Sequence, residues 1–485
     1  MIRLRPVLYV LAAVILILAA TMLLPLAFSL ALDDGIAAAH GKSLALTAAC
    51  GIAMFLVVRK ARAELQTRDG FLLVALVWSL LPALATLPLL FSIDGLSFTD
   101  AYFEAMSGMT TTGATVLTGL DGMPASIHVW RSFLVWIGGM GIIVLTVGIL
   151  PLLGVGGSQL YKAETPGPMK DTKLTPRITQ TAKGLWLVYA AITFACILAF
   201  KVAGMGWLDA LVHAFSTMGL GGFSSHDDSF GYYKSPAIEA VAIVFMLLAG
   251  INFGAHFVAL RARSLQPYWR DPEAGAFLGV TLASCVGVAG YLYLHGTYDS
   301  IAAALRFASF NVVSIATTTG FANTDYNLWP VFAPVWMLFL CCFATCSGST
   351  GGGIKMIRAE VMLRQAHREL RRIIHPRAII PLKVGGRVVE NHIIFAVLAF
   401  MLIYGAVVIA GTLLLLASGL DIVTAFSAVI ACINNTGPGL NQVGPATTYA
   451  VLNDFQTWVC SVLMLLGRLE LITIFVVLTP GFWRE

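Results

Sequence analysis

Four stretches of this chain align on one another without a gap, and each ends in a glycine. They span residues 100–113, 209–222, 307–320 and 424–437, so that the glycines are 109, 98 and 117 residues apart. Position two is alanine in all four stretches, and position eight is serine or alanine. Each stretch is expected to form a short amphipathic helix that leads into a Thr/Gly turn. A ring of such turns around one axis presents backbone carbonyls, which can replace the hydration shell of a cation.

The turn residues are therefore the candidate cation ligands. Glycine permits the backbone angles that direct carbonyls toward an axis, and threonine adds a hydroxyl oxygen. A single glycine turn at a helix end is common and needs no function, but four aligned turns favour an ion filter. The expected ligands are the carbonyls of Thr111, Thr112, Gly113, Leu220, Gly221, Gly222, Thr318, Thr319, Gly320, Asn435, Thr436 and Gly437.

The composition indicates a membrane protein. Of 485 residues, 58% are hydrophobic and only 11% are charged, whereas soluble domains contain about 25% charged residues. Several apolar runs reach the roughly 20 residues that cross a bilayer as a helix. These runs are continuous, which excludes the alternating pattern of a transmembrane barrel. The eight cysteines show neither metal-ligand spacing nor a disulfide framework, and they are expected to be buried apolar residues.

The basic residues give the orientation of ten predicted crossings. The crossings are expected near 7–32, 43–60, 71–92, 128–152, 182–203, 236–260, 276–295, 330–346, 391–418 and 453–480. Of the 30 lysines and arginines, 24 fall on the side that holds both termini, five on the other side and one, Arg468, inside a span. Among the 24 are Lys162, Lys170, Lys173 and Arg177. This asymmetry predicts cytoplasmic termini and places all four glycine turns outside.

The turn-bearing segments are apolar but too short to span, which is typical of re-entrant segments. The expected fold is an all-α polytopic membrane protein. It has four helix–pore-loop–helix repeats around a central pore, preceded by two extra transmembrane helices. The predicted units are residues 1–69 for the extra helices, then 70–175, 176–272, 273–385 and 386–485 for the repeats.

A second group of small and polar residues, at positions 346–355, interrupts the eighth predicted crossing. Glycine costs a helix about 1 kcal/mol per residue, so the helix should break here and resume near Ile354 as a basic stretch that ends near Arg372. A phosphate loop is excluded because no Gly-Lys-Ser/Thr follows a strand. We expect a break in the third repeat only, as a loop that gates the pore; a packing kink is the alternative. The candidate gate residues are Gly348, Ser349, Thr350, Gly351, Gly352, Gly353, Lys355 and Arg468.

Arg468 is expensive to place inside a span, at roughly 2.5–3.5 kcal/mol on insertion scales. Glu470 lies about 200° around the same helix and is a poor partner. We therefore expect Arg468 to face the pore below the filter, to bond carbonyls of residues 348–353 and to repel cations. A structural ion pair is the alternative. Asp100, Glu104 and Asp209 would add negative potential at the pore mouth or, for the two aspartates, compensate the half-helix N-termini.

The turns, together with the sequences WIGGMG at 136–141, GINFGAH at 250–256, GSTGGGIK at 348–355 and GRLE at 467–470, resemble the Trk/Ktr/HKT superfamily of potassium transporters. The two extra helices favour its bacterial TrkH subfamily. The resemblance covers essentially the whole chain. It implies K⁺ as the ion, a homodimer with one pore per subunit, a cytoplasmic nucleotide-binding partner ring of the TrkA type, and the bacterial inner membrane.

The filter turns differ from one another after the shared glycine, where Ala114, Phe223, Phe321 and Pro438 follow. A shorter and less symmetric filter than that of potassium channels predicts weaker discrimination, with K⁺ and Rb⁺ both carried. An ion-coupled secondary transporter of K⁺ with H⁺ or Na⁺ is the alternative, although its inverted repeats and coupling charges are not evident. No nucleophile sequence indicates an enzyme. The basic segment 355–387 is expected to meet lipid or a partner rather than nucleic acid, and no organic cofactor is expected.

Overall fold

The computed structural model describes residues 4–60, 63, 65–149 and 178–484. Within them the chain is mostly helical, and two two-residue strands, β1 (Lys383–Val384) and β2 (Arg387–Val388), pair antiparallel. Lys162, Lys170, Lys173 and Arg177, the end of the predicted 128–152 crossing and the predicted unit boundary after residue 175 lie outside the described residues.

The helices follow the predicted order of two extra crossings and four repeats. The extra crossings are α1 (Leu4–Thr21) with α2 (Leu23–Leu32), and α3 (Ala37–Val58). The first two repeats hold α4 (Thr67–Ala85), α5 (Leu87–Ser92), α6 (Phe98–Met109) and α7 (Ala125–Ile149), then α9 (Ile178–Val202), α10 (Trp207–Gly219), α11 (Pro236–Gly250), α12 (Phe253–Ala262) and α13 (Gln266–Arg270).

The last two repeats follow the same plan. The third holds α14 (Pro272–Leu294), α15 (Ile301–Ala316), α16 (Phe332–Phe343) and α17 (Met356–Ile374), and the fourth holds α18 (Asn391–Ala417), α19 (Ile422–Ile433), α20 (Asp454–Arg468), α21 (Ile472–Leu478) and α22 (Pro480–Arg484). Short 3₁₀ turns stand in the loops after the half-helices: η1 (Leu120–Gly122), η2 (Ser229–Tyr232), η3 (Tyr326–Leu328), η4 (Asn441–Val443) and η5 (Tyr449–Val451).

Six of the described helical segments are long and apolar enough to cross a membrane, and eight qualify if each bent pair counts as one span. Helices α7 and α16 occupy the two remaining predicted crossings. Large apolar side chains are exposed on the outside of the spanning helices, such as Val57 on α3, Leu187 on α9 and Leu402 on α18. Exposed apolar surface of this extent is what a lipid-facing helix presents.

The four half-helices α6, α10, α15 and α19 are the re-entrant segments that the sequence predicts. Three of them begin at a side-chain cap, in which Ser97, Ser300 or Asp421 accepts a hydrogen bond from a backbone N–H of the first turn. Helices α6 and α10 start before the apolar segments expected at 103–110 and 211–218, because polar residues of the first turn belong to the helix but not to its apolar face. Each half-helix ends where a glycine turn begins.

The prediction that only the third repeat contains a broken helix is wrong. Helices α11 and α12 meet at 96°, and α20 and α21 meet at 108°. In the first repeat, α7 has a non-helical residue at Gly141 (φ −4°, ψ −123°). The fourth-repeat break needs only Glu470 and Leu471 at positive φ, so no run of glycines announces it. All four second helices are therefore interrupted, and the third has the longest interruption.

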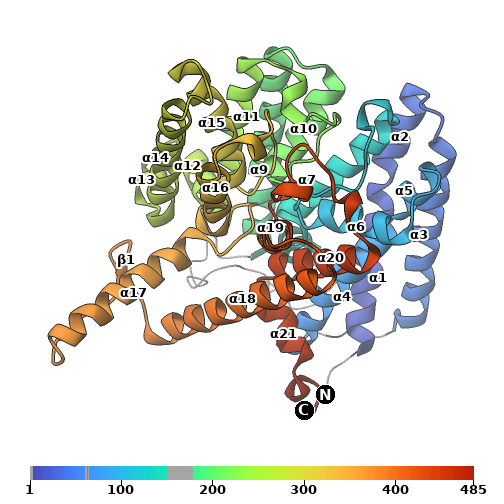
Figure 1. The fold of residues 1–485 in the computed structure, drawn as a ribbon. Coiled ribbons are helices and arrows are strands. Elements are labelled where there is room, and N and C mark those ends of the chain that lie inside the picture. Colours follow the sequence, from blue (N-terminus) through green and yellow to red (C-terminus); the bar gives the residue numbers. More distant parts are fainter. Residues whose placement is uncertain (1–3, 61–62, 64, 150–177, 485) are drawn as a thin grey trace.

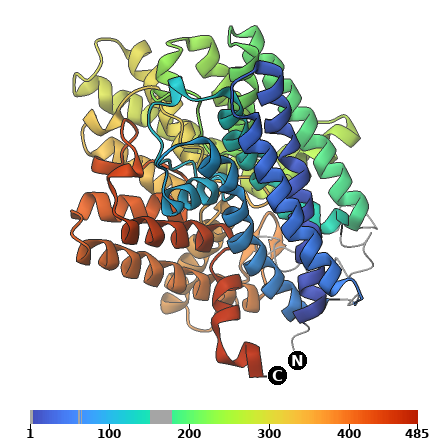
Figure 2. The same ribbon diagram turned by 90° about the vertical axis from the view of Figure 1, so that its right-hand side faces the viewer.

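The two extra helices pack on the first repeat. Tyr9 and Leu11 from α1 share one buried apolar cluster with Trp78 from α4 and Trp130 from α7. The Trp130 indole donates to the carbonyl oxygen of Ala85 over 3.0 Å. The start of α1 and the final helix α22 lie at the same end of the molecule in both views (Figures 1 and 2), as an even number of crossings requires. Helix α17 and the hairpin project from the body (Figure 1).

Candidate ion filter and gate

The four glycine turns share one backbone conformation. The residue two places before each glycine has a left-handed φ, a conformation that non-glycine residues rarely adopt. These residues are Thr111 (φ 56°), Leu220 (54°), Thr318 (58°) and Asn435 (53°). The glycines also have positive φ: Gly113 81°, Gly222 64°, Gly320 89° and Gly437 96°. Four strained turns of the same shape indicate one repeated structural unit.

Each turn is closed by the same hydrogen bond to position eight of the repeat. The backbone N–H of the residue before the glycine donates to the carbonyl oxygen of that small residue. The four bonds run from Thr112 to Ser107 (2.8 Å), Gly221 to Ser216 (3.0 Å), Thr319 to Ser314 (2.8 Å) and Thr436 to Ala431 (2.8 Å). The position-eight residues are fully buried behind the turns, which explains why only serine or alanine occupies this position.

The turns form a closed ring. A Cβ atom on each filter glycine would collide with the carbonyl oxygen of the residue before the next glycine. The distances are 2.0 Å from Gly113 to Gly221, 2.2 Å from Gly222 to Thr319, 2.2 Å from Gly320 to Thr436 and 2.7 Å from Gly437 to Thr112. The contacts run from repeat one through four and back to one. Only glycine allows the four backbones to approach so closely.

The ring therefore brings together all twelve residues that the sequence assigns to the filter. Two of the threonine hydroxyls in the ring form hydrogen bonds with neighbouring side chains. Thr112 Oγ1 contacts Thr110 Oγ1 at 2.8 Å and also accepts a 3.0 Å bond from the amide of Asn435, and Thr319 Oγ1 contacts Thr317 Oγ1 at 2.7 Å. These hydroxyls are engaged within the protein, so the backbone carbonyls are the shared chemistry of the ring.

The interruption between α16 and α17 lies directly against the ring. The backbone N–H of Gly352 donates to Thr318 Oγ1 over 2.9 Å, and the Thr350 hydroxyl donates to the carbonyl oxygen of Met218 over 2.9 Å. A Cβ atom on Gly352 would lie 2.0 Å from the carbonyl oxygen of Asn434. The loop thus contacts residues at or beside the turns of repeats two, three and four.

The other predicted gate residues hold this loop in place. The carbonyl of Gly348 accepts from the N–H of Phe253 at the break of the second repeat (3.0 Å). The Ser349 hydroxyl donates within the loop, to the carbonyl of Cys346 (2.6 Å). The buried Lys355 ammonium donates to the carbonyl oxygen of Gly351, while Gly353, at φ 81°, turns the chain toward α17.

Arg468 connects the loop, the ring and the first repeat. Its Nη1 donates to the carbonyl oxygen of Thr350 over 3.0 Å and to Thr111 Oγ1 over 3.2 Å. Its Nη2 donates to the carbonyl oxygens of Gly138 and of Gly139, the latter over 3.1 Å. The predicted hydrogen bond from Arg468 to the 348–353 loop is therefore present, and a positive charge stands beside the ring.

Other charged side chains are buried more deeply than Arg468, which is itself only partly buried. Glu104 on α6 and Arg131 on α7 are both buried and form an ion pair at 2.7 Å. The expectation that Glu104 adds net negative potential at the mouth is accordingly wrong, because Arg131 neutralises it. The alignment marks Glu104 but not its partner Arg131, since position five of the repeat is polar in three of the four stretches: Glu104, His213 and Asn311.

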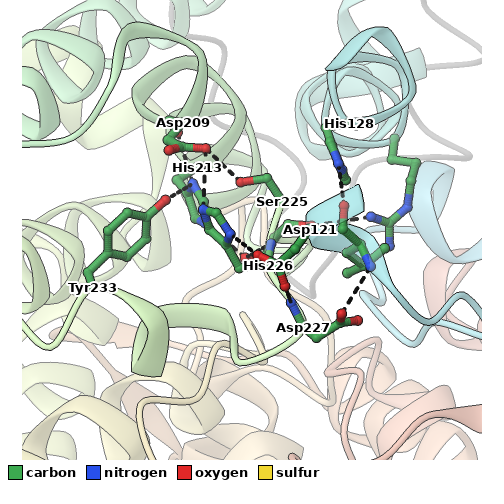
Figure 3. A network of polar contacts seen from close by, with 11 residues as sticks. Asp121, His128, Asp209, His213, Ser225, His226, Asp227 and Tyr233 are labelled. Carbon is green, nitrogen blue, oxygen red and sulfur yellow. Dashed lines mark hydrogen bonds and ion pairs between the residues drawn. The ribbon is translucent and has the colours of Figure 1, made fainter. Parts of the chain in front are cut away.

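A cluster of ionisable groups joins the loops that follow the first two turns (Figure 3). His226 Nδ1 bonds the Asp121 carboxylate, and His226 Nε2 lies 3.6 Å from Asp209 Oδ1. Asp209, in the first turn of α10, also accepts from the Ser225 hydroxyl over 2.8 Å, so its carboxylate contacts the loop that follows the second turn. Partial burial lowers the pKa of His226, but the two carboxylates outweigh burial and raise the pKa above its ordinary 6.5.

The same cluster has backbone contacts. Asp227 accepts from the N–H of Leu120 over 3.0 Å, and His128 Nε2 lies 3.0 Å from the Leu120 carbonyl oxygen. Within the described ranges, no group of three or more His, Cys, Asp or Glu side chains could hold a metal ion. The arrangement therefore ties together the two loops that follow the first and second glycine turns.

Comparisons with known proteins indicate the family of the chain. The family model of TrkH, described as a cation transport protein, matches residues 40–481. The chain is similar to the Trk system potassium uptake protein TrkH of Salmonella typhimurium, with 45% identity over 482 residues and 99% of each chain covered. It is 47% identical to TrkH of Halomonas elongata, over 99% of this chain and 100% of that protein. It also matches the crystal structure of the potassium transporter TrkH from Vibrio parahaemolyticus, with a TM-score of 0.90, 42% identity and full coverage of both chains.

Proposed function

This chain belongs to the TrkH family of cation transport proteins and is a membrane subunit for potassium uptake, and from this premise we propose that K⁺ passes through the closed ring of four glycine turns. The observation that carries the proposal is the ring itself, in which each filter glycine faces the carbonyl of the next repeat. A ring of carbonyl oxygens can replace the water that K⁺ must lose.

The electrostatics of the half-helices support the same role. Each half-helix ends at the ring, so its C-terminal, partly negative end lies next to the ion path. The ligands are the carbonyls of Thr111, Thr112 and Gly113; Leu220, Gly221 and Gly222; Thr318, Thr319 and Gly320; and Asn435, Thr436 and Gly437. K⁺ is the transported ion and not a resident cofactor, and the family's activity is transport rather than catalysis.

The loop of residues 348–353 is the gate of this pathway, with Lys355 and Arg468 as its charged supports. The loop lies against the ring, and Arg468 reaches both at once. A positive charge at this point repels a cation that leaves the filter. Movement of the loop would withdraw Thr350 from Arg468 and open the path. In this scheme the ring selects the ion and the loop controls its flow.

Conduction is channel-like, so that K⁺ follows its own electrochemical gradient. The test is K⁺ flux into proteoliposomes that contain the purified full chain, with the K⁺ gradient, the H⁺ gradient and the Na⁺ gradient varied separately. Flux that depends on the K⁺ gradient and membrane potential alone supports the proposal. Flux that requires an H⁺ or Na⁺ gradient would instead establish the alternative, an ion-coupled transporter.

The setting of this activity follows from the charge distribution. The basic end of the molecule, which carries both termini and α17, faces the cytoplasm across the bacterial inner membrane. Helix α17 projects from the body (Figure 1) and offers a surface to lipid or to another Trk component, such as a nucleotide-binding ring of the TrkA type. The subunit forms a homodimer with one pore per chain.

A further inference from the structure

Each half-helix carries a polar side chain that holds the segment after the filter glycine. Each of these side chains bonds a residue two or three places beyond the glycine of its own repeat. The contacts are Glu104 with the N–H of Val116 (3.1 Å), His213 with the Ser224 hydroxyl (3.0 Å), Asn311 with the Asn323 side-chain carbonyl (2.7 Å) and Ser427 with the N–H of Leu440 (2.8 Å). All four side chains are almost completely buried.

The positions of these side chains follow the repeat. Glu104, His213 and Asn311 occupy position five of the aligned stretches. The fourth repeat has Ala428 at this position, and Ser427, one residue earlier, makes the contact instead. A buried polar side chain without a partner is costly. A polar group maintained here in every repeat therefore points to a shared task, which is to fix the backbone just outside the filter.

The first repeat differs from the others because its polar group is charged and linked to a second repeat. Arg131 Nε donates to Glu104 Oε1 over 2.7 Å, and Arg131 Nη2 donates to Thr115 Oγ1 over 3.2 Å. Arg131 Nη1 donates to the carbonyl oxygen of Ser224 over 3.2 Å. The guanidinium also lies over the Phe223 ring, 4.3 Å from its centroid.

These contacts place one rigid group between two filter turns. Thr115 is two residues after Gly113, and Ser224 is two residues after Gly222. The planar guanidinium presents its N–H groups in a fixed fork, so one arginine sets the distance between both segments. Its charge is compensated by Glu104, and the pair as a whole adds no net charge behind the ring.

From this arrangement the geometry points to Glu104 and Arg131 as positioning residues that determine ion selectivity by fixing the spacing of the first and second filter turns. The inference rests on the proposed function of the ring as the selectivity filter. Discrimination between K⁺ and Na⁺ depends on how the carbonyls are held, and this pair holds two of the four turns against each other.

A second arginine–glutamate pair provides a matched control. Arg306 donates to both carboxylate oxygens of Glu239, over 2.8 and 2.7 Å, and joins α15 to α11. Its guanidinium also lies beside an aromatic ring, that of Phe307, at 5.2 Å. The hydrogen bonds of this pair do not involve a residue that directly follows a filter glycine. Loss of this pair removes a similar interaction without releasing the filter.

The experiment measures the ratio of K⁺ to Na⁺ flux in proteoliposomes for the full chain and for Arg131→Lys, Thr115→Val and Arg306→Met. Lysine keeps the positive charge but cannot reach Glu104, Thr115 and Ser224 together. We expect the Arg131→Lys ratio to fall by about tenfold, the effect of ~1.4 kcal/mol. Thr115→Val should lower the ratio less, because it removes one shared hydroxyl at nearly constant volume. Arg306→Met should leave the ratio unchanged.

Thermal unfolding of each variant separates positioning from loss of fold. If Arg131→Lys does not fold, the ratio for Thr115→Val decides the outcome. An unchanged ratio in a folded Arg131→Lys protein, or an equal fall in Arg306→Met, would overturn the inference. A Gly320→Ala variant tests the filter assignment itself, separately from the positioning role of Arg131. If Gly320→Ala abolishes discrimination and the Arg131 and Thr115 variants do not, only the positioning role is lost.

Discussion

Arg468 donates a hydrogen bond to the carbonyl oxygen of Thr350 over 3.0 Å, and the same guanidinium nitrogen also donates to the hydroxyl of Thr111 in the first filter turn. This pair of hydrogen bonds links the interruption of the third repeat to the ring. In the proposed pathway, it places a positive charge where an ion would leave the ring, and one residue serves both the loop and the ring.

Replacing Arg468 with alanine should increase K⁺ flux. The substitution removes the charge that opposes a cation and releases the loop at Thr350. We expect an increase of roughly tenfold, which corresponds to ~1.4 kcal/mol less in the barrier. Arg468→Lys retains the charge and should stay closer to the original flux. Unchanged flux in a folded Arg468→Ala protein would count against the barrier.

Replacing Gly320 with alanine should abolish selective K⁺ uptake. Its φ of 89° disfavours any Cβ, and that Cβ would lie 2.2 Å from the carbonyl oxygen of Thr436. Gly296→Ala is the control, because Gly296 also has a positive φ (67°) but has no atom within 4 Å of the added Cβ. Both variants incur about 1–2 kcal/mol of backbone strain. Growth of a K⁺-uptake-deficient strain on low K⁺ compares them, and equal growth of both would contradict the filter assignment.

Rubidium should be carried together with potassium. The filter turns share one glycine each but differ in the following residue, as Ala114 and Pro438 illustrate. An asymmetric ring holds its carbonyls less uniformly than four identical turns would. Competition of Rb⁺ with K⁺ flux in proteoliposomes measures this property. Complete exclusion of Rb⁺ would show that the ring is more selective than its sequence predicts.

External pH should affect the stability of the loops beside the ring through His226. The groups that face this imidazole are Asp121 from η1, Asp209 and His213 from α10, and the rings of Tyr232 and Tyr233. The pKa of His226 is raised above 6.5 in the folded protein. The contribution of protonated His226 to the stability of the fold is therefore fully present below pH 6.5 and is lost as pH rises through the raised pKa.

The melting temperature should accordingly fall as pH rises above 6.5, by an amount equivalent to about 1 kcal/mol or less. His226→Gln should remove this dependence. His295→Gln is the control, because His295 is exposed at the end of α14 and forms no ion pair with any described residue. Below pH 3.8 the lowered pKa of Asp121, which the His226 hydrogen bond causes, should produce a separate loss of stability as pH falls. A His226→Gln protein that keeps the same pH dependence would rule out this assignment.

Much of the architecture could be predicted from the sequence because it depends on local patterns. The half-helices are short apolar runs, the turns end in glycine, and the run of Gly, Ser and Thr at 348–353 breaks a helix. Helix α17 begins at Met356, two residues after the predicted restart, and ends at Ile374, two residues beyond the predicted end. These features need no knowledge of what packs against them.

The features that could not be predicted depend on contacts between distant segments. Glu104 and Arg131 are 27 residues apart on two helices, and a charge count assigns Arg131 only to an external loop. The bend at Leu471 needs two residues at positive φ that are not glycines, a conformation that tertiary packing enforces against local preference. The closed order of the ring likewise follows from packing, since the alignment predicts four equivalent turns but not which turn each one touches.

The most direct test of the ion pathway is an anomalous difference map from crystals of this protein grown in Rb⁺. The account predicts density on the axis of the ring, between the carbonyls of Thr112, Gly221, Thr319 and Thr436. A well-ordered ring that is empty of Rb⁺ while the same protein carries Rb⁺ in proteoliposomes, or density at another intramembrane position only, would contradict the account.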